Sequence, residues 1–250
     1  MGSRNMPLPR GNHDSAARLE EPRPILNELG PLHVVGGLPR VNGEVDLERL
    51  IVPLRDRQDT IAAWVLAVPI LRPADLPTVG QDSDPLVEGT RALYQRVIEA
   101  LHARRTPDQG VIAMGHCYMV GSQLSESSER KVMGGNQHPL PHDIFGADIT
   151  YAALGHLHVP QRVSGRENVR YSGAVLPLSF DAKAVHHSVV LVEIAGTQTT
   201  SIRELQGVRA ERRAASTRCR LRHLAGAARS RRWPRRSTAT PGGMRRPGQT

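Results

Sequence analysis

The chain has 250 residues and a mass of 27.4 kDa, the size of one large domain or of one domain with a small extension. Its longest apolar stretch, residues 61–71, is too short for a membrane-spanning helix, and the N-terminus lacks the apolar run of a secretory signal. Two cysteines exclude a disulfide framework or a cysteine-based zinc site. We therefore expect a cytoplasmic protein.

The formal net charge of +9 is concentrated in one segment. Residues 209–250 carry 13 arginines and a single acid, a net charge of +12, which leaves −3 for residues 1–208. Because this tail is rich in Arg, Pro, Gly and Ser and has no lasting apolar period, we expect it to be disordered. Such a tail either holds nucleic-acid phosphates electrostatically or is an arbitrary extension, for example from out-of-frame translation, and its composition favours the second interpretation.

Predicted strands and helices alternate along residues 1–208, which indicates an α/β fold. A strand is predicted at residues 61–70. Asp84 and Pro85 are suited to the N-cap and first turn of an amphipathic helix that ends near Arg105. Its apolar stripe is formed by Leu86, Thr90, Leu93, Tyr94, Val97, Ile98 and Leu101. Further strands are predicted at residues 111–114, 149–154, 169–178 and 186–194.

Polar side chains follow two of these strands directly. One strand stops at Gly115-His116 and the other at Gly155-His156-Leu157-His158. Ligand sites of open α/β sheets lie outside the carboxyl ends of the strands, so these histidines are expected to share a site. Imidazole is the commonest protein ligand for transition metals, and residues i and i+2 of an extended segment point to the same side.

A third polar cluster, Gly11-Asn12-His13-Asp14, adds an amide oxygen, which suits a hard ion such as Mn²⁺, and a His beside a carboxylate, the pattern of an oriented general acid. Each cluster has a structural alternative: a lone Gly-His step is more often structural, a His-x-His pair is equally often accidental, and Gly-Asn-His-Asp is compatible with a capped turn. Their order along the chain favours a shared site.

In that order the clusters resemble the motifs of the calcineurin-like metallophosphoesterases. More narrowly, the chain is similar to the nuclease family that comprises the D subunit of bacterial SbcCD and the Mre11-like nucleases. The segments that carry this similarity lie between Gly11 and Gly196 and read GNHDSAARLE, HVVGGLPR, SESSERKVMGG, YAALGHLHVPQRV and VRYSGAVLPLSF.

The resemblance implies a partial metallophosphoesterase β-sandwich flanked by helices over residues 11–208, after a non-family leader at 1–10 and before the disordered basic tail at 209–250. It also implies phosphodiester hydrolysis with two Mn²⁺ ions. In this scheme Asn12, His116 and His156 hold one ion and His158 belongs to the other. His13 contacts the phosphate and assists protonation of the leaving group, and Asp14 orients His13.

By the same resemblance, the chain is part of an ATP-dependent DNA exonuclease and endonuclease that serves repair, recombination and replication. Its implied partners are an SbcC-like ATPase subunit, duplex DNA ends and hairpins, and a second copy in a homodimer, with no membrane.

The family's Asp-x-His and Gly-Asp motifs, which supply carboxylate ligands, do not occur in this sequence at suitable places. Because only ten residues precede Gly11, we expect a chain truncated at its N-terminus and altered at its C-terminus. Two alternatives to an active nuclease are a catalytically inactive remnant and a basic protein that binds nucleic acid through its tail. The missing motifs favour the remnant for this polypeptide, and the net charge of −3 in residues 1–208 disfavours the basic binder.

Overall fold

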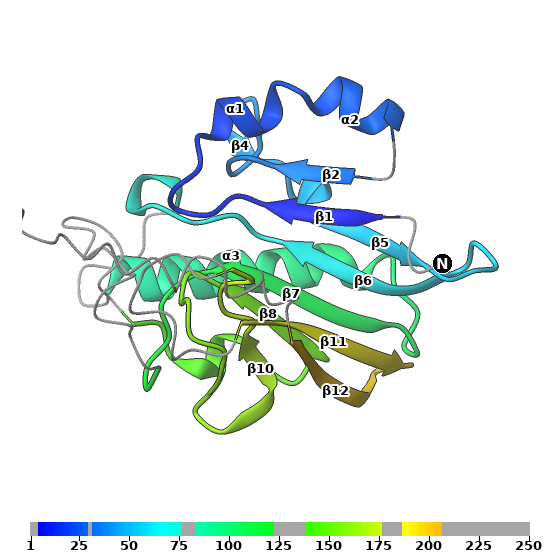
Figure 1. Cartoon of the computed structure of the whole chain (residues 1–250). Helices are drawn as coiled ribbons and strands as arrows, with labels where there is room; N and C mark the ends of the chain where they lie inside the picture. The colour runs from blue at the N-terminus through cyan, green and yellow to red at the C-terminus, as the bar shows by residue number, and fades with distance from the viewer. Residues whose placement is uncertain (1–4, 30–31, 77–83, 123–138, 177–186, 207–250) are drawn as a thin grey trace, which may run out of the picture. The chain divides into compact units, whose positions relative to one another are not determined.

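The computed structural model describes residues 5–29, 32–76, 84–122, 139–176 and 187–206, all in one compact unit that ends at Arg209. A mixed six-stranded sheet in the order β5-β6-β7-β8-β10-β9 forms its centre (Figure 1). The strands are β5 (Ile51–Arg55), β6 (Ile61–Ala67), β7 (Gly110–His116), β8 (Tyr151–Gly155), β9 (Gln161–Val163) and β10 (Arg166–Tyr171). Strands β6, β7, β8 and β10 run parallel, so their carboxyl ends share one edge, whereas β5 and β9 are antiparallel to their neighbours.

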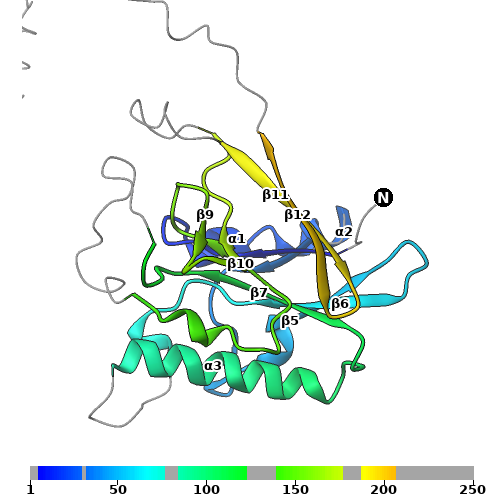
Figure 2. The same ribbon diagram turned by 90° about the horizontal axis from the view of Figure 1, so that it is seen from below.

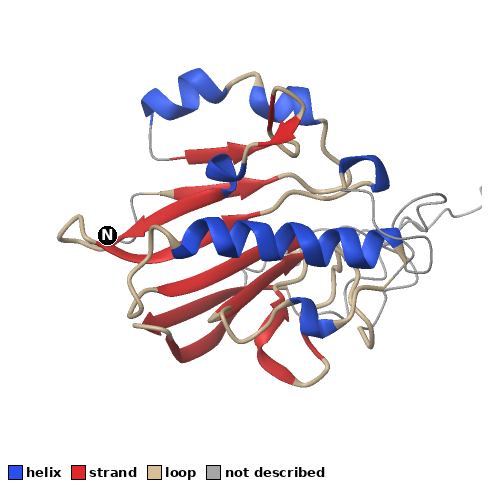
Figure 3. Ribbon diagram, turned by 180° about the vertical axis from the view of Figure 1, so that it is seen from behind, coloured by secondary structure: helices blue, strands red, loops and turns tan. Residues whose placement is uncertain are grey.

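Helix α3 (Pro85–His102) covers one face of this sheet (Figure 3). The Asp84 carboxylate accepts hydrogen bonds from the backbone N–H groups of Leu86 and Val87, which confirms the predicted N-cap. The predicted apolar stripe is also confirmed, because all seven of its members are buried. The connecting helices α1 (Ala16–Glu20) and α2 (Arg23–Leu29) are short. Among the described residues, a long helix therefore connects only β6 with β7.

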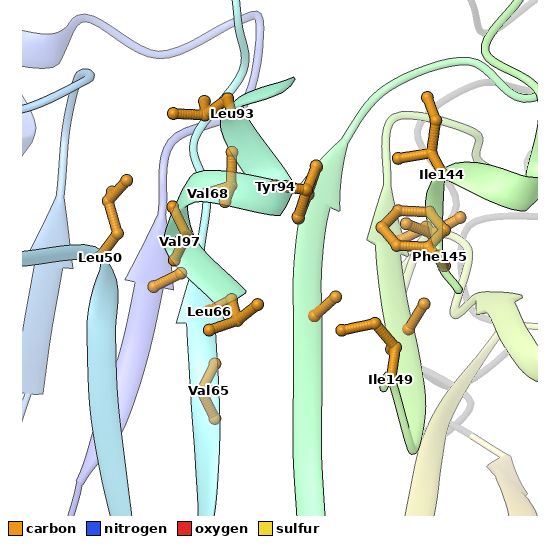
Figure 4. Packing of buried hydrophobic residues seen from close by; sticks show 14 of the residues in the cluster. Leu50, Val65, Leu66, Val68, Leu93, Tyr94, Val97, Ile144, Phe145 and Ile149 are labelled. Carbon is orange, nitrogen blue, oxygen red and sulfur yellow. The ribbon is translucent and has the colours of Figure 1, made fainter. Parts of the chain in front are cut away.

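A large part of the hydrophobic core lies between α3 and the sheet (Figure 4), and buried residues such as Val35 and Val65 continue it on the other face. Leu66 of β6 and Val97 of α3 are fully buried. Tyr94 meets Phe145 edge to face, with ring centroids 5.3 Å apart, and Phe145 follows a 3₁₀ turn, η3 (His142–Ile144). Two further 3₁₀ turns are η1 (Leu47–Leu50) and η2 (Pro73–Asp75). These contacts pack α3 onto the sheet.

A second, two-stranded parallel sheet pairs β1 (Met6–Pro9) with β2 (Leu32–Val35). Arg10, the residue after β1, donates its N–H to Val35 O. Because backbone N–H groups alternate in direction along a strand, the nitrogens of Pro7 and Pro9 point away from β2. The two prolines therefore remove no hydrogen bond between β1 and β2. The hairpin of β3 (Arg40–Val41) and β4 (Glu44–Val45) turns at Asn42 and Gly43, whose φ angles of 52° and 86° fit a type I′ turn.

Strands β11 (Ser188–Ala195) and β12 (Gln198–Gln206) form an antiparallel hairpin on the sheet face opposite α3 (Figure 2). The hairpin approaches the amino ends of β7 and β8: the Thr199 hydroxyl donates to Thr150 O. A Cβ atom on Gly110 would lie 2.8 Å from Gly196 O, so the contact requires glycine at the start of β7.

The predicted strands at 61–70, 111–114, 149–154 and 186–194 are confirmed by β6, β7, β8 and β11. The strand predicted at 169–178 ends at Tyr171, because Gly173 turns the chain with a φ of 74°. Residues 123–138 of the SESSERKVMGG region, the end of VRYSGAVLPLSF and the arginine-rich tail lie outside the described residues. None of the helices found in the described ranges is long and apolar enough to cross a membrane.

Candidate metal centre

Three of the predicted ligands meet at the carboxyl edge of the sheet. His116 is the last residue of β7 and pairs with Gly155, the last residue of β8, so His156 follows directly beside it. Asn12 arrives from the loop after β1. That loop is held in place because Arg10 bonds Val35 O through its N–H and accepts from Ile70 N–H through its carbonyl. Residues 104 positions apart in sequence therefore face one another.

The Asn12 side chain contacts the His116 ring directly. His116 Nε2 lies 2.8 Å from Asn12 Oδ1 and 3.2 Å from the Asn12 backbone nitrogen. If Nε2 carries the proton it donates to the amide oxygen, and in the other tautomer it accepts from the backbone N–H. One ring nitrogen is thus within hydrogen-bond reach of both Asn12 groups.

His156 packs edge to face against His116, with ring centroids 5.2 Å apart and ring planes inclined by 67°. Its backbone φ of 105° is a conformation that non-glycine residues adopt only at an energetic cost of about 1–3 kcal/mol. Strain of this kind is typical of functional sites, where the surrounding structure holds a side chain in a required place.

Two glycines make room for His116. A Cβ atom on Gly11 would lie 2.8 Å from His116 Cε1, and a Cβ atom on Gly155 would lie 3.0 Å from His116 Nδ1. The glycine of each motif is therefore needed for the close approach of the His116 imidazole from β7.

Burial and, to a smaller extent, the charges of the neighbouring His156, His13, His158 and Arg10 together lower the pKa of His116 to about 3, because all of them disfavour the protonated ring. The imidazole is therefore neutral at physiological pH. A neutral ring keeps a nitrogen lone pair, which is the form in which histidine binds a metal ion.

The remaining predicted site residues lie around this group. His13 and Asp14 are exposed at the start of the loop, and the Asp14 carboxylate accepts a hydrogen bond from Gly11 N–H at 3.1 Å. That bond fixes the loop, and the role of Asp14 in orienting His13 stays a prediction. His158 is held through its backbone, because its carbonyl accepts from Ala174 N–H at 3.0 Å.

The donor set fits one side of a metal coordination sphere. Two ligand atoms about 2.1 Å from an ion and at right angles to each other are about 3.0 Å apart, close to the 2.8 Å between Asn12 Oδ1 and His116 Nε2. The set nevertheless lacks carboxylates: the described residues contain no group of three or more His, Cys, Asp or Glu side chains placed to hold a metal ion. Asn12 Oδ1 and His116 Nε2 thus have the spacing of two adjacent ligands, and the residues described do not supply the carboxylates of the expected two-ion centre.

Sequence reasoning missed several residues that shape this centre. Arg10 contributes a positive charge near His116. Tyr94 and Tyr171 donate hydrogen bonds to the backbone on either side of His116. Tyr94 was predicted only as a core residue, because a helical apolar period does not show where the hydroxyl of a tyrosine ends.

Comparison with known proteins finds relatives that all carry the same name. No protein-family model matches the sequence. The chain is 44% identical to the D subunit of nuclease SbcCD from Rhodobacter capsulatus over 194 residues, 76% of this chain and 47% of that protein. It is 32% identical to the D subunit of nuclease SbcCD from Escherichia coli K12 over 204 residues, 78% of this chain and 48% of that protein. The Bacillus subtilis protein of the same name is 29% identical over 77% of the chain.

This similarity over more than three quarters of the chain establishes the class: the chain belongs to the Mre11-like metallophosphoesterase family. Within this family it is a homologue of the D subunit of nuclease SbcCD. The chain spans about half the length of the curated relatives that it matches.

Proposed function

We propose that this chain provides the phosphodiester-hydrolysing domain of an SbcCD-type DNA nuclease, and that Asn12, His116 and His156 hold one Mn²⁺ ion in it. The observation that carries the proposal is the meeting of the Asn12 amide with the His116 ring, beside His156, at the carboxyl edge of the sheet. Homology to the D subunit of nuclease SbcCD supports DNA as the substrate class.

Mn²⁺ bound at such a site would polarise a phosphodiester and make a bound water more acidic. The chain's own residues have separate roles. The neutral His116 ring offers a lone pair without a charge penalty. His13, which is exposed, would contact a phosphate and protonate a leaving oxygen, with Asp14 orienting it. His158 is assigned to the second ion.

The wider assembly follows from the same homology. We propose an SbcC-like ATPase partner, duplex DNA ends and hairpins as substrates, a homodimer, and a role in DNA repair and recombination in the cytoplasm. We also propose that residues 11–208 form a partial β-sandwich, in which β1–β2 and β11–β12 contribute a second layer. Residues 209–250 are proposed to be a basic tail. Deleting residues 209–250 is expected to leave DNA retention largely unchanged.

A second candidate is a metal-binding domain that does not hydrolyse DNA by itself. It is favoured by the donor chemistry, since one amide and two imidazoles lack the carboxylates of a two-ion centre in the described part of the molecule. The two candidates differ in the number of ions bound and in cleavage, not in the position of the first ion.

The proposal is tested by dialysing the full chain against Mn²⁺ and counting bound ions, then assaying cleavage of a hairpin-ended DNA duplex. An active nuclease binds close to two ions and cleaves, and His13→Ala abolishes cleavage while metal stays bound. One ion without cleavage supports the second candidate.

His102→Ala is the matched control, because His102 is an exposed imidazole that pairs with Asp148 away from the site. It leaves both measurements unchanged. Absence of any bound ion, or cleavage that is unaffected by His13→Ala, contradicts the roles assigned.

A further inference from the structure

Two buried tyrosines hold the backbone that carries His116. The Tyr94 hydroxyl, from α3, donates to Met114 O at 2.8 Å. The Tyr171 hydroxyl, at the end of β10, donates to Cys117 O at 2.7 Å. The two carbonyls lie two residues before and one residue after His116, so both sides of the ligand's backbone are fixed by side chains from other elements.

Both tyrosines are rigid supports. Tyr94 is 3% exposed and meets Phe145 edge to face, and Tyr171 is fully buried. Burial raises the pKa of both hydroxyls above the ordinary value of a tyrosine, so each remains a protonated donor across the physiological range.

Gly115 completes the arrangement. A Cβ atom at this position would lie 2.8 Å from the Tyr94 hydroxyl oxygen. The glycine before His116 is therefore needed for a specific contact, because it lets the tyrosine hydroxyl reach the strand end from the helix side. The other atoms near that Cβ position are at ordinary contact distances, Leu154 Cδ2 at 3.5 Å and Cys117 Sγ at 3.7 Å.

We propose that Tyr94 and Tyr171 are positioning residues that hold the Gly115–Cys117 backbone so that the His116 ring meets Asn12. This inference rests on the proposed function for its importance to metal binding, but the positioning itself does not require a metal. A metal-ligating histidine is normally fixed through the other nitrogen of its own ring. In this protein, the two tyrosines instead hold the main chain on both sides of His116.

The test compares Tyr94→Phe and Tyr171→Phe with Tyr151→Phe in the full chain. Tyr151 is a buried tyrosine on β8 that pairs with Ile112, at the end of the strands remote from His116, and its variant removes a tyrosine hydroxyl away from the His116 backbone. Three quantities are measured: amide hydrogen exchange at residues 115–118, the ring nitrogen signals of His116 by NMR, and Mn²⁺ affinity.

We expect exchange at residues 115–118 to become about five- to tenfold faster in Tyr94→Phe and in Tyr171→Phe, as the loss of one neutral hydrogen bond predicts. The His116 Nε2 signal shifts as its contact with Asn12 loosens, and Mn²⁺ affinity falls roughly threefold to tenfold. Exchange in β5 and β6 stays unchanged, which separates local positioning from general destabilisation. Tyr151→Phe changes none of these quantities.

Gly115→Ala provides an independent variant if a tyrosine variant fails to fold. The added methyl group meets the Tyr94 hydroxyl, so Gly115→Ala reproduces the exchange increase, and adding it to Tyr94→Phe causes little further change because the hydroxyl is already gone. The proposal is overturned if the tyrosine variants match Tyr151→Phe in exchange and in the His116 signal. If the wild-type chain binds no Mn²⁺, the proposed function fails, while exchange and NMR still decide the positioning.

Discussion

The two ends of the parallel strands use polar side chains in different ways. At the amino end, polar groups are satisfied by nearby structural partners: Trp64 Nε1 donates to Gln109 Oε1 at 2.7 Å, Gln109 Nε2 donates to Ile61 O at 2.8 Å, and the Thr150 hydroxyl accepts from Val111 N–H. At the carboxyl end, two imidazoles and an amide meet one another instead. Polar groups at the amino end stabilise the fold, whereas those at the carboxyl end bring lone pairs together.

Replacing a ligand gives the largest expected difference between the two ends. His116→Ala removes one of three donors and should lower Mn²⁺ affinity by at least roughly 100-fold, since even outer partners of metal ligands contribute about 10- to 100-fold. The measurement is calorimetric titration with Mn²⁺. Unchanged affinity in His116→Ala would place the metal elsewhere.

Matched glycine substitutions separate stability from binding. Gly110→Ala forces a methyl group to within 2.8 Å of a backbone oxygen, Gly196 O, and should reduce the free energy of unfolding by about 1–3 kcal/mol without changing Mn²⁺ affinity. Gly155→Ala presses on the His116 ring and should weaken Mn²⁺ binding more than it weakens the fold. Urea denaturation and Mn²⁺ titration of both variants check this, and equal effects on both quantities in both variants would remove the distinction.

A substitution at the amino end alone sharpens the same comparison. Gln109→Leu leaves the buried Trp64 indole N–H without its acceptor and should lower the free energy of unfolding by about 1–2 kcal/mol. Mn²⁺ affinity should stay at the wild-type value. A parallel loss of metal binding would mean that the two ends are not independent.

The smallest effect concerns pH in the metal-free protein. The pKa of His116 is about 3 in the folded chain and about 6.5 when unfolded, so the unfolded state binds more protons below pH 6.5. Its contribution to stability is fully present above pH 6.5 and is lost as the pH falls toward 3. Between pH 7.5 and 5.5 the wild type should lose about 1 kcal/mol more than His116→Gln in urea denaturation. Parallel losses would show that His116 is not buried as described.

Local sequence signals predicted the parts of the molecule that local physics controls. The cap at Asp84 and the stripe of α3 follow from short-range hydrogen bonding and a 3.6-residue period, and both are confirmed. The order of the three histidine-bearing clusters predicted that Asn12 and His116 would converge, and they do.

Tertiary contacts explain what the sequence did not predict. The strained φ of His156 and the hydroxyl contacts of Tyr94 and Tyr171 depend on elements that pack from elsewhere in the chain. Strand β1 was not predicted either. A proline weakens a strand only where its missing N–H group would face the neighbouring strand, and the pairing that decides this is a tertiary contact.

The most direct test of the metal centre is pulsed electron paramagnetic resonance of Mn²⁺ bound to the full chain with ¹⁵N-labelled histidine. If Asn12, His116 and His156 hold one ion, the spectrum contains coupling to two imidazole nitrogens, and His156→Ala removes one of them. A Mn²⁺ spectrum without histidine nitrogen coupling would contradict the assignment of these ligands.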